Sequence, residues 1–260
     1  MKNSLTFALV QVDLAWEKKD QNLKHIEELM KDHIKNADVI ALPEMFSTGF
    51  SMASSTLAES MSGPTIAWMA KQASTYDALI CGSLIVKEND DYYNRMVWVY
   101  PTGEMGCYDK RHLFRMGNEN QHFSSGNKRK VISWRGWRIC PQICYDLRFP
   151  VWSRNRNDYD VLMYSANWPA SRDDVWSTLL KARALENQSY VVGVNRIGCD
   201  QMGVDYVGDS LIFDFKGARL NSDSLNDEIV QEVTFCKEDL EDFRAKFPVL
   251  KDADDFEIQM

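Results

Sequence analysis

Short apolar segments that look like β-strands alternate with amphipathic segments along almost the whole chain, and this alternation constrains the fold most. The strand-like LTFALVQVDL precedes a helical pattern that begins near Asp20. The apolar face of that predicted helix is made by Leu23, Ile26, Met30 and Ile34. The order recurs with DVIALPE and a helix that has Pro64 in its first turn. Helices and strands in this order predict an α/β protein with large, mostly buried sheets.

The rest of the chain continues this pattern without a repeat or a low-complexity linker. ALICGSLIVKEND is expected to pair with YNRMVWVYPTGEMGCYDK, and VISWRGWRICPQICY is typical of another strand pair. After Pro150 we expect a short helix, a strand in YDVLMYSAN, a helix in DDVWSTLLKARALENQS and a strand in YVVGVNRIG. YVGDSLIFDFKGARL and DEIVQEVTF are expected to close the sheets. The sequence therefore predicts one domain over residues 1–260.

Charge and cysteine usage argue against several classes of protein. The net charge of -8 disfavours non-specific binding to nucleic acid or to an anionic membrane. No apolar run approaches the roughly 20 residues that a bilayer span needs. The first apolar segment is interrupted by Gln11 and Asp13 in strand-like alternation, unlike a signal peptide. Six cysteines without CxxC spacing indicate free thiols. We therefore expect a cytoplasmic protein.

One cysteine stands in an unusual place for a residue that only fills space. In RICPQICYDLRFP, Cys144 ends an apolar run at the point where a charged turn begins. Glu44 and Lys110 have comparable positions, just after the apolar segments DVIALP and GEMGCYD. In a layered α/β fold, side chains at strand ends converge on a cleft. Each residue also has an ordinary interpretation, as a loop carboxylate, a surface charge and a core thiol.

ALPEMF, YDKRHLF and ICYDLRFP resemble the three signature segments of the nitrilase superfamily of carbon–nitrogen hydrolases, in the same order. Within the superfamily, MSGPT, KRHLFRMGNE and RFPVWSRN are most similar to the bacterial omega-amidases. The resemblance extends over nearly the whole chain. It implies a four-layer αββα sandwich that dimerises so that two sandwiches share an extended core. It also implies an enzyme that needs no metal or organic cofactor.

The resemblance assigns a catalytic triad to Glu44, Lys110 and Cys144. Many members have a second glutamate in a segment that resembles NENQHFSSG, which gives that role to Glu119. One departure is visible, because many members have a glutamate after RFP and this chain has Val151. A role for that glutamate in holding the nearby Arg148 is therefore not expected here.

The chemistry of these residue types agrees with the assignment. A thiol of ordinary pKa, about 8.5, is mostly protonated at neutral pH, so a nucleophilic cysteine needs a base or a cation beside it. Glu44 can take the proton of Cys144, while Lys110 and the backbone N–H of Tyr145 stabilise the oxyanion. Glu119 is expected to help position the water that hydrolyses the thioester.

Further residues are candidates for contacts with the substrate. Arginine forms bidentate pairs with carboxylates, and aromatic side chains can form an apolar wall. These candidates are Phe46, Arg115, Arg148, Trp168 and Arg172. Each also has a structural interpretation; Arg148 in particular is expected to pair with the neighbouring Asp146.

Two alternatives concern the histidines and a helical ion pair. His112 offers a Cys–His mechanism with Asp146 as the orienting group. The four histidines are scattered and predict no metal site. Arg183 and Glu186, at i and i+3 of a predicted helix, are expected to pair with each other.

The resemblance therefore implies hydrolysis of the terminal amide of a small 2-oxo-dicarboxylic monoamide, such as 2-oxoglutaramate or 2-oxosuccinamate. Two alternatives stay open at this point. One is an N-carbamoyl or other aliphatic amide hydrolase of the same superfamily. The other is a non-catalytic sandwich that binds a protein partner. The expected partners of the enzyme are a small amide and a second copy of the chain, with no nucleic acid and no membrane.

Overall fold

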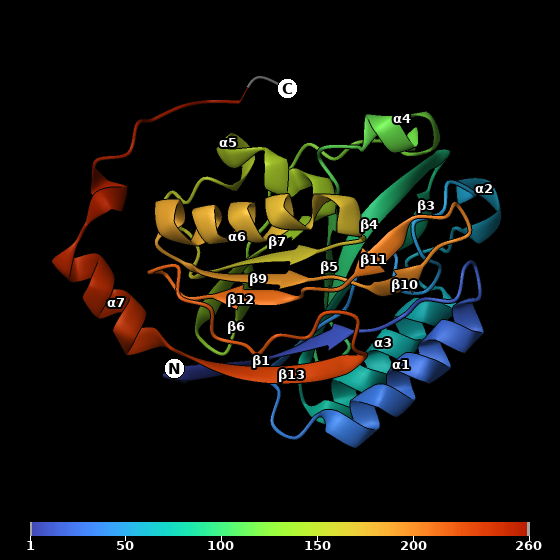
Figure 1. Cartoon of the computed structure of the whole chain (residues 1–260), viewed down its shortest axis with the longest axis horizontal. Helices are drawn as coiled ribbons and strands as arrows, with labels where there is room; N and C mark the ends of the chain where they lie inside the picture. The colour runs from blue at the N-terminus through green and yellow to red at the C-terminus, as the bar shows by residue number, and fades with distance from the viewer. Residues whose placement is uncertain (1, 259–260) are drawn as a thin grey trace.

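Two β-sheets packed against each other form the centre of the computed structural model, which describes residues 2–258 (Figure 1). The larger sheet has the strand order β13–β1–β2–β3–β4–β5. In that order its strands are Ile229–Cys236, Ser4–Gln11, Val39–Ala41, Leu79–Glu88, Asp91–Val99 and Met105–Asp109. β1, β2 and β3 are parallel, whereas the strands at both edges are antiparallel.

The second sheet has the order β12–β9–β8–β7–β6. Its strands are Leu211–Phe213, Tyr190–Val194, Val161–Ser165, Trp137–Ile143 and Ile132–Trp134. Again the centre is parallel and the edges are antiparallel. A separate two-stranded ribbon, β10 (Ile197–Cys199) and β11 (Asp205–Val207), extends beside the end of this sheet.

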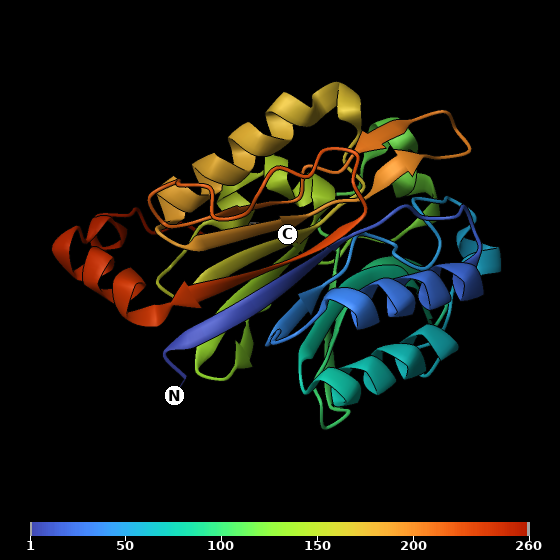
Figure 2. The same cartoon turned by 60° about the horizontal axis from the view of Figure 1, so that its bottom comes forward.

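Helices cover the outer face of each sheet, so the layers run α–β–β–α (Figure 2). α1 (Lys19–His33) and α3 (Pro64–Tyr76) pack on the larger sheet, and α6 (Asp173–Asn187) packs on the smaller one. The predicted four-layer sandwich is therefore confirmed. The shorter helices are α2 (Ser54–Leu57), α4 (Glu119–His122), α5 (Pro150–Ser153) and α7 (Lys237–Lys246). Single 3₁₀ turns are η1 (Arg115–Gly117), η2 (Cys144–Arg148), η3 (Ala170–Arg172) and η4 (Val249–Lys251).

The alternation of side chains along a strand explains these layers. In β1, Phe7 and Leu9 point into the core between the two sheets, and Ala8 and Val10 point toward α1 and α3. Both faces are apolar because both are covered, which is why the strands read as nearly continuous apolar runs.

The carboxyl ends of the two sheets meet at one place. The Ser165 hydroxyl, at the end of β8, donates a hydrogen bond of 2.7 Å to the carbonyl of Leu42, just after β2. The backbone N–H of Glu44 is directed at the carbonyl of Ala166 at 3.4 Å. This junction brings loops from both sheets together and positions the site described below.

Two parts of the described chain differ from the sequence-based expectation. α7 was not predicted, because its mostly charged sequence buries only Leu240 and so lacks a clear apolar face. The segment YVGDSLIFDFKGARL, which was expected to close the sheets, is divided between β11 and β12. The chain leaves the two-stranded ribbon after β11 and enters the smaller sheet at β12.

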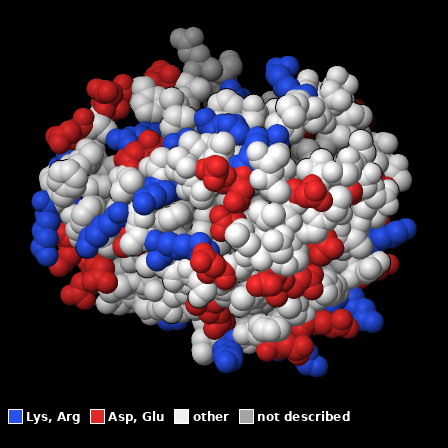
Figure 3. Space-filling view, in the orientation of Figure 1, with Lys and Arg blue, Asp and Glu red and all other residues white. Residues whose placement is uncertain are grey.

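Acidic and basic side chains are interspersed on the face shown in Figure 3, with no continuous basic area there. Among residues 2–258, no helix combines the length and the apolar character needed to cross a bilayer.

Candidate active site

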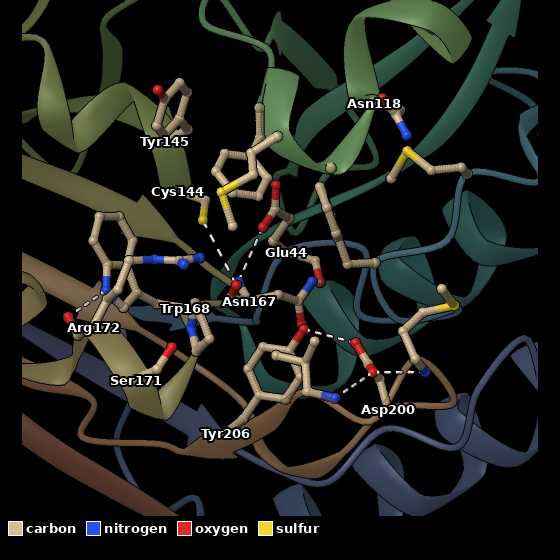
Figure 4. A pocket seen from close by; sticks show the side chains of 18 of the residues that line it. Glu44, Asn118, Cys144, Tyr145, Asn167, Trp168, Ser171, Arg172, Asp200 and Tyr206 are labelled. Carbon is tan, nitrogen blue, oxygen red and sulfur yellow. Dashed lines mark hydrogen bonds between the residues drawn. The ribbon is translucent and has the colours of Figure 1, made fainter.

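A cavity of about 620 Å³ lies where the loops after β2, β5 and β7 converge, and Glu44, Lys110 and Cys144 all line it. Lys110 directly follows β5 and Cys144 directly follows β7, while Glu44 comes three residues after β2. In Figure 4, Cys144 and Glu44 both face Asn167. The three residues therefore converge on one cavity, as the sequence predicted.

Cys144 begins a sharp turn from the strand into η2. Its φ of 41° lies in the left-handed region, which is uncommon for a residue with a side chain. The buried carboxylate of Asp146 fixes this turn, because it accepts the backbone N–H of Ile143 at 3.1 Å and that of His112 at 3.0 Å. It also accepts the Tyr108 hydroxyl at 2.7 Å. The segment after β5 and the segment after β7 are thus held to one carboxylate.

Two buried carboxylates share one buried ammonium. Lys110 Nζ lies 2.7 Å from Glu44 Oε1 and 2.9 Å from Glu119 Oε2. The backbone N–H of Phe114 donates to Glu119 at 2.6 Å, and that of Asn167 donates to Glu44 at 3.0 Å. Such a cluster is tolerated in the interior because its oxygens are hydrogen-bonded as well as paired.

The pKa values follow from this arrangement. Burial opposes the charge on Lys110, but the negative charges of Glu119 and Glu44 outweigh it and raise the pKa of Lys110 above its usual value. The low-dielectric surroundings, together with the negative charge of Glu44, raise the pKa of Cys144, although Lys110 acts against this. The resting thiol is therefore protonated, so a nucleophilic attack needs a base at the moment of reaction.

Glu119 is a buried member of this cluster and not an exposed loop residue. It opens α4, within the segment that the sequence suggested was a polar loop, and its side chain is 0% exposed. Burial, followed by repulsion from Glu44, raises the pKa of Glu119, while Lys110 and a hydrogen bond from Asn94 lower it. The alternative interpretation of an exposed loop glutamate is wrong. A catalytic role for Glu119 stays a prediction.

Asn167 is a site residue that the sequence analysis did not identify. Its side-chain amide donates to the backbone carbonyl of Glu44 at 2.7 Å, and Cys144 Sγ lies 3.9 Å from the carbonyl oxygen of Asn167. The available signal was its position at the end of the strand-like segment YDVLMYSAN, the same position that singled out the other three residues.

Two of the three candidate arginines line the cavity. The guanidinium of Arg148 lies over the ring of Trp168, 5.1 Å from its centroid, and that of Arg172 lies over Phe114 at 5.4 Å. In residues 2–258 neither guanidinium has an acidic oxygen within 4.0 Å. Arg115 instead lines a neighbouring depression, so its expected place in the site is wrong.

Of the aromatic candidates, some line the cavity and one does not. Trp168 and Tyr145 line the cavity. Phe46 does not: it is fully buried below the loop and packs on Trp68, with ring centroids 5.9 Å apart. An aromatic residue in an apolar segment gave no sign of which way it pointed.

Arg148 was expected to pair with Asp146, and this expectation is wrong. The oxygens of Asp146 are occupied by the backbone and by Tyr108 and His112. His112 stacks on Phe149 at 3.7 Å and lines the neighbouring depression, not the cavity of Cys144. The arrangement therefore does not favour the Cys–His mechanism.

The helical pair was predicted correctly. Arg183 and Glu186 are joined at 2.9 Å, and Arg183 also donates to the carbonyl of Leu147. Within the described part of the chain, no group of three potential ligand side chains is placed to hold a metal ion.

Replacing Lys110 by alanine is expected to lower the free energy of unfolding by about 3–5 kcal/mol, because it leaves two buried carboxylates without their cation. Urea denaturation measures this loss. Lys246→Ala is the matched control, since Lys246 forms an exposed ion pair with Asp242 and should contribute little. Equal stability of the two variants would contradict the idea that Lys110 neutralises a buried cluster.

Comparisons with known proteins agree with this geometry. The sequence profile of the carbon-nitrogen hydrolase family matches residues 6–244. The chain is 45% identical to the omega-amidase YafV of Yersinia enterocolitica, over 98% of each chain. It is 33% identical to the 2-oxoglutaramate amidase of Bacillus subtilis, over 95% of this chain and 96% of the relative. A CN-hydrolase superfamily protein from Xanthomonas campestris, solved with an arsenic adduct in its active site, superposes with a TM-score of 0.96 at 39% identity. That superposition covers 99% of this chain and 100% of the other.

Proposed function

This chain belongs to the carbon-nitrogen hydrolase family, and because it is 45% identical to an omega-amidase over 98% of its length, we propose that it is an omega-amidase. Its substrate is a small 2-oxo-dicarboxylic monoamide such as 2-oxoglutaramate or 2-oxosuccinamate, and its products are the 2-oxo acid and ammonia. The observation that carries this proposal is the cavity itself. It is lined by a thiol, a carboxylate and an ammonium, and by two arginines that have no acidic oxygen within 4.0 Å among residues 2–258.

In the proposed acylation step, Cys144 Sγ attacks the amide carbon while Glu44 takes the thiol proton. The oxyanion that forms is stabilised by Lys110 Nζ and by the backbone N–H of Tyr145. Glu44 returns the proton to the departing ammonia, which leaves a thioester on Cys144.

In the proposed deacylation step, a water attacks the thioester carbon and Glu44 accepts its proton. The C–S bond then breaks, the 2-oxo acid leaves, and Glu44 returns the proton to Cys144 Sγ. Glu119 also contacts Lys110 Nζ, at 2.9 Å, and helps to position this water. The raised pKa of Cys144 supports a mechanism in which Glu44 takes the thiol proton as the sulfur attacks.

The arginines support a substrate that carries a carboxylate at the end opposite to its amide. Each guanidinium rests on an aromatic ring and meets no acidic oxygen within the described residues 2–258, so it is available for a bidentate pair with a carboxylate. An apolar part of the wall suits the methylene groups between the two ends; it includes Phe50, Met52, Phe114, Met116, Met202 and Val204. Asn118, His122, Ser171 and Asp200 line the cavity as well.

A panel of amides tests the proposed substrate. Purified protein is given 2-oxoglutaramate, succinamate, butyramide or an N-carbamoyl amino acid, and ammonia is measured. We expect the highest kcat/KM with 2-oxoglutaramate. A preference for the N-carbamoyl compound would overturn the proposed substrate, and no release from any compound would contradict an amidase.

Arg148→Gln and Arg172→Gln are each expected to raise KM for 2-oxoglutaramate about tenfold or more, because a hydrogen bond to a charged group contributes about 1.5–3 kcal/mol. Butyramide lacks the carboxylate, so its slower hydrolysis should be unaffected. Arg115→Gln is the matched control, since Arg115 lies outside the cavity. If all three variants have the KM of the wild type, the arginines do not bind the substrate.

We also propose that the enzyme is a single carbon–nitrogen hydrolase domain over residues 1–260 that works in the cytoplasm as a homodimer. The six cysteines are all free, which is compatible with a reducing compartment. Analytical ultracentrifugation tests the dimer, and a monomer at micromolar concentration would contradict it.

A further inference from the structure

The side chain of Asn94 lies at the centre of the buried charge cluster. It projects from β4 and is 0% exposed. Its amide nitrogen donates to Glu44 Oε1 at 2.8 Å and to Glu119 Oε1 at 2.9 Å. Both N–H groups of one amide are therefore used on two different carboxylates.

A hydrogen bond to the oxygen of the Asn94 amide sets the orientation of the amide. The hydroxyl of Ser83, on the neighbouring strand β3, donates to Asn94 Oδ1 at 2.9 Å. The backbone N–H of Met45 donates to the oxygen of the same hydroxyl at 2.9 Å. Because the Ser83 proton points at Oδ1, the nitrogen of Asn94 must face the two glutamates.

The backbone of Asn94 belongs to the same arrangement. Its carbonyl accepts the N–H of Lys110 at 3.0 Å, so one residue contacts both glutamates through its side chain and Lys110 through its main chain. The titratable groups around this position are Glu44 after β2, Lys110 after β5, Glu119 in α4 and Cys144 in η2.

Two carboxylates and one ammonium leave this cluster with one excess negative charge. Neighbouring carboxylates in the protein interior tend to hold a proton, because like charges disfavour the second ionisation. Each N–H of Asn94 is a donor that stabilises the charged form of one glutamate. The pKa of Glu119 reflects this competition, since burial and Glu44 raise it while the hydrogen bond from Asn94 lowers it.

We infer that Asn94 is a positioning residue: its two N–H groups hold the carboxylates of Glu44 and Glu119 on Lys110 and stabilise negative charge there, with Glu44 placed to take the Cys144 proton. This inference rests on the proposed function. It differs from a purely structural role in one measurable respect. Loss of the amide changes the pH at which the site becomes active, and not only the stability of the fold.

The test uses Asn94→Ala and Ser83→Ala, with Val97→Ala as the matched control. Val97 is a fully buried residue of β4 that packs in the core beneath α1 and α3, away from the glutamates. Two pH profiles are recorded: kcat for 2-oxoglutaramate, and the rate of Cys144 alkylation by iodoacetamide, followed by peptide mass spectrometry.

Asn94→Ala should move the acid limb of both profiles to higher pH by about one unit or more, because a carboxylate that loses a donor keeps its proton longer. Alkylation requires the Cys144 thiolate, and the proposed acceptor of that proton belongs to the cluster that Asn94 contacts, so alkylation should report the same shift. Ser83→Ala leaves the amide in place but unoriented and should shift both limbs less, in the same direction. Val97→Ala should lower Tm and leave both limbs unchanged.

If Asn94→Ala folds and the acid limbs of its kcat and alkylation profiles do not move, the inference is overturned, whatever the loss in Tm. If Asn94→Ala does not fold, an unmoved limb in Ser83→Ala overturns it instead. The alkylation profile separates this outcome from a failure of the proposed function. A wild type that releases no ammonia from 2-oxoglutaramate contradicts the substrate, while the alkylation rates still decide the role of Asn94.

Discussion

Replacement of Cys144 by alanine is expected to lower kcat by at least about 10⁴-fold, to the background of the ammonia assay, while the folded structure is retained. The sulfur is the group that forms the thioester, and no neighbouring side chain can replace it. The fold should tolerate the change because the sulfur lies at the cavity and is only partly buried. Circular dichroism and Tm check the fold, and a coupled assay for ammonia checks the activity.

The other cysteines provide the control. Cys140 is four residues away in β7, but it is fully buried and burial raises its pKa to about 11, so it should be unreactive. Cys140→Ala is therefore expected to keep most of the activity. Mass spectrometry of the wild type with a slowly hydrolysed amide should place the acyl adduct on Cys144. An adduct on Cys140 or Cys107 would refute the assignment of the nucleophile.

The layers of the fold could be predicted because their cause is local. A helix such as α1 has an apolar face at helical spacing, and strands buried on both faces are continuous apolar runs. The pairing of β3 with β4 followed from a turn between two adjacent strands. The ribbon of β10 and β11 was missed because Ile197–Val207 lies outside the main sheets, where no apolar pattern of the core applies.

The convergence of the three candidate residues could also be predicted, because strand ends and polar turns are visible in the sequence. Glu44, Lys110 and Cys144 were placed by that criterion together with the family resemblance. The direction of each side chain was not visible. Phe46 and Arg148 both follow apolar segments. Phe46 is buried against Trp68, whereas Arg148 lies over Trp168 in the cavity.

Asn94 shows more clearly which site residues cannot be predicted from the sequence. It lies inside the strand YNRMVWV, where a polar residue usually marks an exposed face of a sheet. Only the three-dimensional arrangement reveals that this face is covered by Glu44 and Glu119. A buried amide has no sequence signal when its partners are 50 and 25 residues away.

Glu44→Gln is expected to lower kcat by about 10³-fold or more by preventing acylation, because glutamine keeps the size of glutamate but cannot take the thiol proton. The fold should survive this change. Lys110 still has Glu119 as its partner at 2.9 Å, and the cluster changes from one excess negative charge to none. In rapid-quench experiments no burst of ammonia should appear, and intact mass spectrometry should detect no acyl-enzyme.

Glu119→Gln is the matched control, since it removes the same charge from the second carboxylate that contacts the same ammonium. Its carboxylate contacts Lys110, Asn94 and the backbone of Phe114, and it is not positioned to accept the Cys144 proton. Acylation should therefore continue. The burst of one ammonia per site should remain, the steady-state rate should fall, and the acyl-enzyme should accumulate because its hydrolysis is impaired. If Glu44→Gln retains a burst and Glu119→Gln loses it, the roles of the two glutamates are reversed and Glu119 is the base.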